Sequence, residues 1–238
     1  MENPATMHRP EKTRVREMFD NIAPKYDLLN TLLSFGMHKC WKRKAIRLLK
    51  KDHVRSFLDV ATGTADLAIM AARLKPEQVF GVDISVRMID RGRKKIRKRR
   101  LDHLVKLMMA DSEVLPFLDD TFDAVTVAFG VRNFENLEKG LAEMLRVLKP
   151  GAKVVILEFS TPTKSPFRQL YHFYFTHILP VIGRLISRDS KAYRYLPDSV
   201  GRFPAGEEFV NILKNVGYVN TEFRSLSFGI ACIYTGKK

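Results

Sequence analysis

Residues 57–66 read Phe57-Leu58-Asp59-Val60-Ala61-Thr62-Gly63-Thr64-Ala65-Asp66. An apolar run thus passes through small residues around Gly63, and apolar residues then recur with helical spacing over residues 67–74. This pattern predicts a strand, a tight turn and a helix. The turn lets the backbone approach a ligand, and the helix start offers unpaired N–H groups and a positive dipole end. A polar ligand with a negative group is favoured, although an ordinary strand-to-helix turn carries the same pattern.

A second acidic residue follows the next apolar run, at the end of residues 79–83. Asp83 comes 20 positions after Gly63 (83 − 63), where nucleotide-binding βαβ units place the carboxylate that binds the ribose hydroxyls. Ala61 and Ala65 replace the outer glycines of the dinucleotide pattern, so no cradle for a diphosphate is present. A ribose ligand without a diphosphate suggests S-adenosylmethionine rather than NAD.

The chain is long and apolar enough for one domain, 1–238, since 45% of its 238 residues are hydrophobic. Its formal net charge of +15 favours an anionic partner, either nucleic acid or an acidic membrane surface. Cys40 and Cys232 form neither a disulfide framework nor a metal site, which favours a reducing compartment. Residues 1–16 are polar and charged, unlike a signal peptide, and no long apolar run predicts a membrane span.

Further strands are predicted over residues 105–109, 122–128 and 153–159, with a helix between the last two closed by Lys149-Pro150-Gly151. Strands that alternate with helices at this spacing indicate an α/β fold with a doubly wound parallel sheet. Ligands of such sheets bind beyond the strand carboxyl ends. Asp111 and Ser112 follow one strand and are candidates to lie near an adenine, although turn residues would look the same.

Basic residues crowd the segment that begins with the predicted N-cap Ser85. Eight of the ten residues from 91 to 100 are Lys or Arg, so we expect charge on every face of a mostly solvated helix. The alternative is a patch that binds anionic lipid or RNA, with about 1 kcal/mol for each basic group near the surface.

Residues 15–41 mix aromatic and polar side chains ahead of the first strand of the sheet. Tyr26 with Asp27, and His38 with Trp41, place polar groups among apolar ones. We expect residues 1–50 to form a helical cover over the cofactor; the alternative is simple packing of two amphipathic helices.

Two long patterns resemble the signatures of the quinone C-methyltransferases of menaquinone and ubiquinone biosynthesis, which are class I, Rossmann-like enzymes. The first comprises Tyr26-Asp27-Leu28-Leu29-Asn30, Ser34, His38 and Trp41; the second comprises residues 146–152 and Glu158-Phe159-Ser160. Phe129-Gly130-Val131-Arg132-Asn133 is similar to a third stretch of that family. Leu29, Ala65 and Ala152 depart from the usual pattern by small or volume-conserving changes.

The resemblance implies a seven-stranded sheet whose last two strands form an antiparallel hairpin. Residues 161–203 then form a helical insertion before the last helix and strand pair, rich in aromatic residues. We interpret this insertion as a lid and channel for a prenyl tail, with Arg168, Arg184 and Arg188 placed for headgroups; a core helix pair is the alternative.

The implied reaction is S-adenosylmethionine-dependent C-methylation of a prenylated demethylquinol, with demethylmenaquinol preferred. Ala128, where enzymes that serve both quinones tend to have Ser, favours menaquinone over a ubiquinone precursor. The expected cofactor-binding residues are Thr64, Asp83, Asp111 and Ser112, with Asp59 and Gly63 shaping the pocket. The expected catalytic residues are Arg132, Asn133, Tyr26 and His38, and no metal is expected.

Two other classes compete with this interpretation. A nucleic-acid methyltransferase would suit the charge, but residues 128–131 lack the Asn/Asp-Pro-Pro-aromatic pattern of base-amine methylation and neither cysteine follows a proline. A regulatory module that binds the cofactor without turnover has no distinguishing sequence feature. We expect a cytoplasmic protein held reversibly on the inner, anionic face of the membrane by the basic helix and the insertion together, without a nucleic-acid partner. The oligomeric state is open, with a homodimer as one option.

Overall fold

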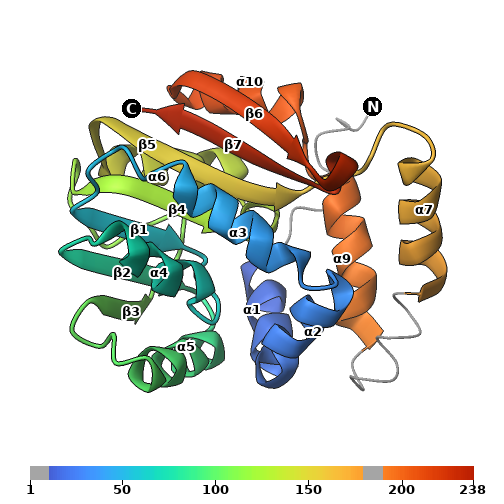
Figure 1. Ribbon diagram of the computed structural model, residues 1–238, viewed down its shortest axis with the longest axis horizontal. Helices are drawn as coiled ribbons and strands as arrows, with labels where there is room; N and C mark the ends of the chain where they lie inside the picture. The colour runs from blue at the N-terminus through green and yellow to red at the C-terminus, as the bar shows by residue number, and fades with distance from the viewer. Residues whose placement is uncertain (1–10, 179–189) are drawn as a thin grey trace.

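A computed structural model describes residues 11–178 and 190–238, centred on a sheet with the strand order β3-β2-β1-β4-β5-β7-β6 (Figure 1). The strands are β1 Ser56–Val60, β2 Gln78–Asp83, β3 Val105–Met109, β4 Phe122–Ala128, β5 Leu148–Phe159, β6 Val219–Leu226 and β7 Ala231–Lys237. Pairing is parallel from β3 through β5, and β7 runs antiparallel to both β5 and β6. The predicted seven-stranded sheet and its antiparallel last strand are confirmed.

Helices cover both faces of this sheet and its strand carboxyl ends. They are α1 Lys12–Ile22, α2 Tyr26–Leu33, α3 Met37–Arg47, α4 Asp66–Ala71, α5 Val86–Lys98, α6 Leu137–Val147, α7 Phe167–Phe173, α9 Ser190–Arg202 and α10 Glu207–Val216. Alternate side chains of β1 point to opposite faces, so Phe57 joins the core under α3, α4 and α5, while Leu58 joins the core under α6 and α10. Because helices cover both faces, all five residues of β1 are buried.

The fifth strand begins earlier than the sequence predicts. Lys149-Pro150-Gly151 was expected to separate a helix from the strand, but α6 ends at Val147 and β5 already starts at Leu148. Leu148 pairs with Phe122, and the register then shifts before Ala124 pairs with Lys153. An irregularity in the ladder therefore accommodates the proline within an otherwise paired strand.

Helix α5 corrects the expectation of charge on every helical face. Its N-cap is Ser85, as predicted, whose hydroxyl accepts the N–H of Met88 at 3.1 Å. The helix buries Met88, Ile89, Gly92 and Ile96 along one side, so its basic residues occupy the remaining surface. A Cβ on Gly92 would lie 2.6 Å from Leu107 Cδ1, which explains why α5 can pack so closely on the sheet only with glycine there.

Helices α1, α2, α7 and α9 lie beyond the carboxyl ends of the parallel strands, within the regions predicted as the cover, residues 1–50, and the insertion, residues 161–203 (Figure 1). Helices α1 and α2 come from the cover, and α7 and α9 come from the insertion. None of the side chains of α7 is buried, which disfavours the alternative of a helix pair in the core. In the chain as described, no helix combines the length and apolarity needed to cross a bilayer.

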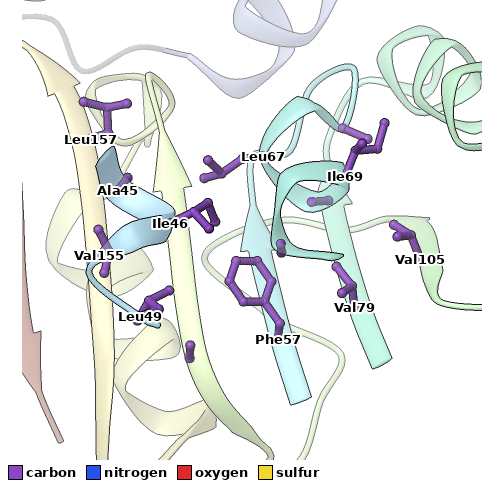
Figure 2. Packing of buried hydrophobic residues seen from close by; sticks show 14 of the residues in the cluster. Ala45, Ile46, Leu49, Phe57, Leu67, Ile69, Val79, Val105, Val155 and Leu157 are labelled. Carbon is purple, nitrogen blue, oxygen red and sulfur yellow. The ribbon is translucent and has the colours of Figure 1, made fainter. Parts of the chain in front are cut away.

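Helix α3 is anchored by its apolar side chains against the sheet, as Figure 2 shows. Ala45 and Ile46 project from α3, and Leu49 follows it, toward the side chains of β1 and β5. All three are at most 4% exposed. This contact fixes the helix that carries His38 and Trp41 relative to the strand ends.

Replacing Leu49 by Ala should lower the free energy of unfolding by about 2–5 kcal/mol, because a cavity remains where the side chain was. The matched control is Leu118→Ala, since Leu118 is 83% exposed whereas Leu49 is 1% exposed. Urea denaturation of both variants measures the difference. Equal stability of the two variants would contradict this account of the core.

Candidate active site

The carboxyl ends of the central strands surround a cleft, here called the cofactor cleft. Its walls come from the turn after β1, the ends of β2 and β4, the loop after β3 and the helix α1. Of the predicted site residues, the cleft brings together Tyr26, Gly63, Asp83, Asp111, Ser112 and Asn133.

Asp83 occupies the end of β2 and faces the turn that follows β1. One carboxylate oxygen accepts the N–H of Gly63 at 2.7 Å and the other accepts the N–H of Ser85 at 2.9 Å. Burial raises the pKa of Asp83 to about 6, and the two backbone hydrogen bonds partly oppose this shift. Each oxygen retains a lone pair, so the carboxylate can still accept two ligand hydroxyls.

Asp59 braces the turn after β1 through hydrogen bonds on the side away from the cleft. The Asp59 carboxylate accepts the hydroxyls of Thr62 at 2.6 Å and Thr126 at 2.9 Å, and the N–H of Ala68 at 3.2 Å. Burial raises its pKa to about 6. Asp59 is 1% exposed and does not line the cleft, so it shapes the pocket from behind. Gly63 has φ +56°, a conformation that favours glycine, and it does line the cleft.

Thr64 points away from the cofactor cleft. Its hydroxyl donates to Asp27 at 2.6 Å and accepts from the Lys95 ammonium at 2.9 Å. Lys95 also contacts Asp66, which pairs with Lys42 at 3.2 Å. Thr64 thus belongs to a network that joins the cover to α4 and α5, and the structure does not bring it to the cofactor cleft with the other predicted residues.

Lys12, which sequence reasoning missed, reaches the cleft from the first residue of α1. Its ammonium lies 2.8 Å from Asp111 Oδ2 and 2.8 Å from Glu113 Oε2. The two carboxylates raise the pKa of Lys12, outweighing the opposing effect of burial. A single lysine near the start of the chain gives no sequence signal for this role. The contact places α1 across the cleft and beside Ser112.

A second hollow, here called the apolar cavity, has a volume of about 460 Å³ and adjoins the cofactor cleft. Phe19, Tyr26 and Phe129 line both spaces, so the two meet at an aromatic wall. Most of the other lining residues come from the cover and the insertion. They include Leu29, Leu33, His38, Trp41, Arg132, Phe159, Phe167, Leu170, Tyr171, Tyr174, Tyr195, Leu196 and Phe228.

Arg132 lies in the wall of this cavity within a buried ion pair. Its guanidinium donates to Glu158 Oε1 at 2.7 Å and to the carbonyl of Phe129 at 2.6 Å. The Arg132 side chain is 7% exposed and that of Glu158 is 0% exposed. Glu158 belongs to the second family signature and lies at a strand carboxyl end, but it was not among the predicted site residues.

Asn133 lines the cofactor cleft, and its side-chain oxygen accepts the hydroxyl of Tyr195 at 2.9 Å. Tyr195 comes from α9 and lines the apolar cavity, so this bond connects the two spaces. Sequence offered no signal for Tyr195, since the bond spans 62 positions.

Tyr26 and His38 each bring a polar group from the cover to the wall of the apolar cavity. Burial raises the pKa of Tyr26, which keeps its phenol protonated near neutral pH. Nδ1 of His38 lies 2.7 Å from the hydroxyl of Ser34, and the indole N–H of Trp41 donates to Ser227 at 2.9 Å. Of the four predicted catalytic residues, Arg132, Tyr26 and His38 line this cavity, whereas Asn133 lines the neighbouring cleft.

The insertion contributes to the cavity only in part as predicted. Phe167, Leu170, Tyr171 and Tyr174 line the cavity, whereas Arg168 is exposed and does not. Several predicted channel and headgroup residues lie outside the described part of the chain. They are Leu179, Val181, Ile182, Arg184, Leu185, Ile186 and Arg188.

Comparison with known proteins decides the family. The model of the ubiE/COQ5 methyltransferase family matches residues 7–238. The chain belongs to this family. It is therefore an S-adenosylmethionine-dependent methyltransferase, and the resemblance found in its signatures is confirmed.

Curated relatives of the family cover nearly all of the chain. A "demethylmenaquinone methyltransferase" of Bacteroides fragilis is 48% identical over 94% of this chain and 92% of its own length. A "ubiquinone/menaquinone biosynthesis C-methyltransferase UbiE" of Geobacter sulfurreducens is 50% identical over 98% and 92%. Among solved structures, a possible histamine N-methyltransferase of Thermotoga maritima shares the fold, with a TM-score of 0.65 and 18% identity over 94% of this chain and 99% of that chain.

The cofactor cleft fits S-adenosylmethionine by the chemistry of its walls. Asp83 offers acceptors for two ribose hydroxyls, and a Cβ on Gly63 would take up space in the cleft, 3.7 Å from Tyr26 Cε1. Asp111 and Ser112 line the far side of the cleft, where the adenine would lie. Bound S-adenosylmethionine supplies an electrophilic methyl group on a sulfonium.

Asp83→Asn should weaken S-adenosylmethionine binding roughly 10-fold to 150-fold, because charge-assisted hydrogen bonds contribute about 1.5–3 kcal/mol. Wild-type affinity should fall as the pH drops through about 6, since protonation of Asp83 removes its charge and turns one of the two acceptor oxygens into a donor. Calorimetric titration across this range measures both effects.

The matched control is Asp90→Asn, because Asp90 is an exposed carboxylate on the nearby helix α5. Any pH dependence left in Asp83→Asn is assigned to Asp59, whose pKa is also about 6. Unchanged affinity together with unchanged pH dependence in Asp83→Asn would contradict the assignment.

Proposed function

We propose that the protein transfers the methyl group of S-adenosylmethionine to a ring carbon of a prenylated demethylquinol, with demethylmenaquinol preferred. The observation that carries this proposal is the aromatic wall of Phe19, Tyr26 and Phe129 between the cofactor cleft and the apolar cavity. An acceptor ring at this wall would lie beside the methyl donor, with space for an apolar tail behind it. The names of the relatives from Bacteroides fragilis and Geobacter sulfurreducens support the same reaction.

The residues around the wall would orient the acceptor and exclude water. Arg132 is held by Glu158, so its guanidinium has a fixed direction in the cavity wall, where it can stabilise charge on a quinol oxygen. Tyr26 and His38 offer further polar contacts to the ring hydroxyls. Trp41 and Phe159 line the same space and keep it dry.

A ubiquinone precursor is the alternative acceptor within the same reaction, because the printed name of the Geobacter sulfurreducens relative includes both quinones. A nucleic-acid acceptor is disfavoured by the cavity itself. Its lining is mainly aromatic and aliphatic, whereas an extruded base needs several polar partners on its edge.

Methyl transfer from labelled S-adenosylmethionine should appear in reduced demethylmenaquinone, more slowly in a demethoxy-type benzoquinol, and not in RNA. The expected preference follows from the fit of an apolar bicyclic ring to the aromatic wall. Quinol extraction followed by counting of the label measures all three acceptors. Label in RNA with none in either quinol would contradict the proposed function.

Membrane contact is part of this proposal, because a prenylated quinol dissolves in lipid. The cavity opens between exposed apolar side chains: Phe35 is 75%, Leu170 is 60% and Phe228 is 69% exposed, and all three also line the cavity. Lys39 and Arg43 on α3 are exposed close to Phe35 in the chain. We call these five residues the cavity rim, and we propose that it rests on the anionic inner face of the membrane.

The sequence suggested that the basic run of α5 and the insertion act together, but the structure separates them. Helix α5 starts at the carboxyl end of β2 and leads back to the amino end of β3, so residues 97–100 lie toward the amino ends of the strands, whereas the cavity rim lies beyond their carboxyl ends. Figure 1 likewise shows α5 well apart from α7. The rim therefore replaces the basic run as the proposed contact surface.

Substituting Phe35 and Phe228 by Ser, or Lys39 and Arg43 by Gln, should reduce sedimentation with anionic vesicles. The first pair of substitutions removes apolar area that would be buried in the membrane. The second pair removes about 1 kcal/mol of binding free energy for each basic group. The control changes Arg97, Lys98, Arg99 and Arg100 to Gln and should keep vesicle binding.

Neutral vesicles and a water-soluble short-chain quinol complete the experiment. The rim variants should lose anionic-vesicle binding, while Lys39→Gln/Arg43→Gln keeps turnover of the soluble quinol. If the α5 control loses anionic-vesicle binding while both rim variants keep it, the basic run of α5 and not the cavity rim is the membrane contact.

A further inference from the structure

His38 and Ser34 form a hydrogen-bonded pair whose geometry fixes which nitrogen of the imidazole carries the proton. The Ser34 hydroxyl lies 2.6 Å from the carbonyl oxygen of Asn30, which can only accept. The serine proton is therefore committed to Asn30, and Ser34 Oγ must accept the hydrogen bond that joins it to His38 Nδ1 at 2.7 Å. This geometry assigns the hydrogen to Nδ1 and leaves the lone pair on Nε2.

The junction between α2 and α3 holds this pair rigidly. Ser34 is the C-cap of α2, Gly36 in the left-handed conformation is the N-cap of α3, and His38 is the second residue of α3. Ser34 is 7% exposed and His38 is 3% exposed, yet His38 lines the apolar cavity. The ring is thus closed off from bulk water and open to whatever fills the cavity.

Burial, together with the nearby ammonium groups, keeps the ring of His38 neutral near neutral pH. Burial is the largest cause that lowers the pKa of His38, to about 4, and the Lys42 ammonium adds to it. Lys39 acts in the same direction, whereas the carboxylates of Asp66 and Asp27 oppose the shift. The Nε2 lone pair is consequently available over the whole physiological range.

We propose that His38 Nε2 accepts the hydrogen bond of the substrate hydroxyl beside the methylated carbon, and that Ser34 is the positioning residue that holds Nε2 unprotonated. This inference rests on the proposed function, since it assigns the contact that orients the ring. A quinol hydroxyl is a donor, so the unprotonated nitrogen of a neutral imidazole in the cavity wall matches it.

The proton balance follows from this contact. The ring π electrons form the bond to the methyl carbon, and the electrons of the broken carbon–sulfur bond remain on sulfur as a thioether. The hydroxyl proton moves to Nε2 as its oxygen becomes a carbonyl. Because positive charge develops on that oxygen during the attack, its proton becomes acidic enough for a weak base. The imidazolium then returns its proton to the oxygen, and the methylated carbon loses its hydrogen to solvent water as the products leave the cavity, which restores the quinol and the neutral imidazole.

The first test reads the tautomer directly, without turnover. In the full chain labelled with ¹⁵N-histidine, long-range proton–nitrogen spectra should show the His38 signal with protonated Nδ1 and unprotonated Nε2. Its absence in His38→Asn assigns the signal among the six histidines. Ser34→Ala should convert the signal wholly or partly to the other tautomer. A protonated Nε2 in the wild-type protein overturns the inference.

The second test measures methyl transfer to a soluble demethylquinol. His38→Asn keeps a donor where Nδ1 was and leaves no atom where Nε2 was, so kcat should fall by about 10²-fold or more. Ser34→Ala should lower kcat about 10-fold, because His38 can then present Nε2–H. KM for S-adenosylmethionine should not change in either variant. His38→Gln, which returns an amide near the Nε2 position, should recover part of the loss.

Ser56→Ala is the matched control for Ser34→Ala, because Ser56 is a buried, hydrogen-bonded serine at the amino end of β1. It should lose similar stability in thermal unfolding and keep wild-type kcat. A wild-type kcat in folded His38→Asn overturns this inference alone, whereas a wild-type protein that methylates no quinol overturns the proposed function.

Discussion

The buried carboxylate of Asp59 holds together the elements from which the site is built. It receives the hydroxyl of Thr62 from the turn, the hydroxyl of Thr126 from β4 and the N–H of Ala68 from α4. A buried charge is tolerated only when donors replace its lost water, and three donors do so here. With the turn fixed in this way, the N–H of Gly63 meets Asp83 at the end of β2.

The cover is attached to this frame by a network of charges rather than by apolar packing alone. Asp27 of α2 and Lys95 of α5 bond the hydroxyl of Thr64, and Lys95 also pairs with Asp66 of α4, which in turn pairs with Lys42 of α3. Shared partners reduce the entropy lost for each pair, so a network of partly buried charges stabilises more than isolated surface pairs do. The network sets the cover beside the cleft, which places Tyr26 in the wall between the two spaces.

Sequence patterns predicted the fold well because its signals are local. The apolar runs of β1 to β4, the Ser85 cap and the interval from Gly63 to Asp83 can all be read within short windows. They also predicted that Asp83, Asp111 and Ser112 would share one cleft, because strand carboxyl ends meet at one edge. Family signatures added Tyr26, His38 and Arg132.

Side-chain directions depended on partners far away in the chain. Thr64 turns from the cleft because Asp27, 37 positions earlier, takes its hydroxyl. The buried face of α5 was hidden because its few apolar residues lie among many basic ones. Tyr195 and Lys12 enter the site only through tertiary packing, for which no local pattern exists.

The ion pair between Arg132 and Glu158 has a consequence for how such a cavity can diverge. Loss of either partner would strand the other charge in a wall from which water is excluded, at a cost of about 3–5 kcal/mol, whereas joint replacement by apolar residues can be nearly neutral. Substitutions at position 132 and at position 158 are therefore coupled. A descendant that adapted this cavity to a ring without oxygens would have to exchange both residues at once, and single-step evolution toward such a substrate would pass through an unstable intermediate.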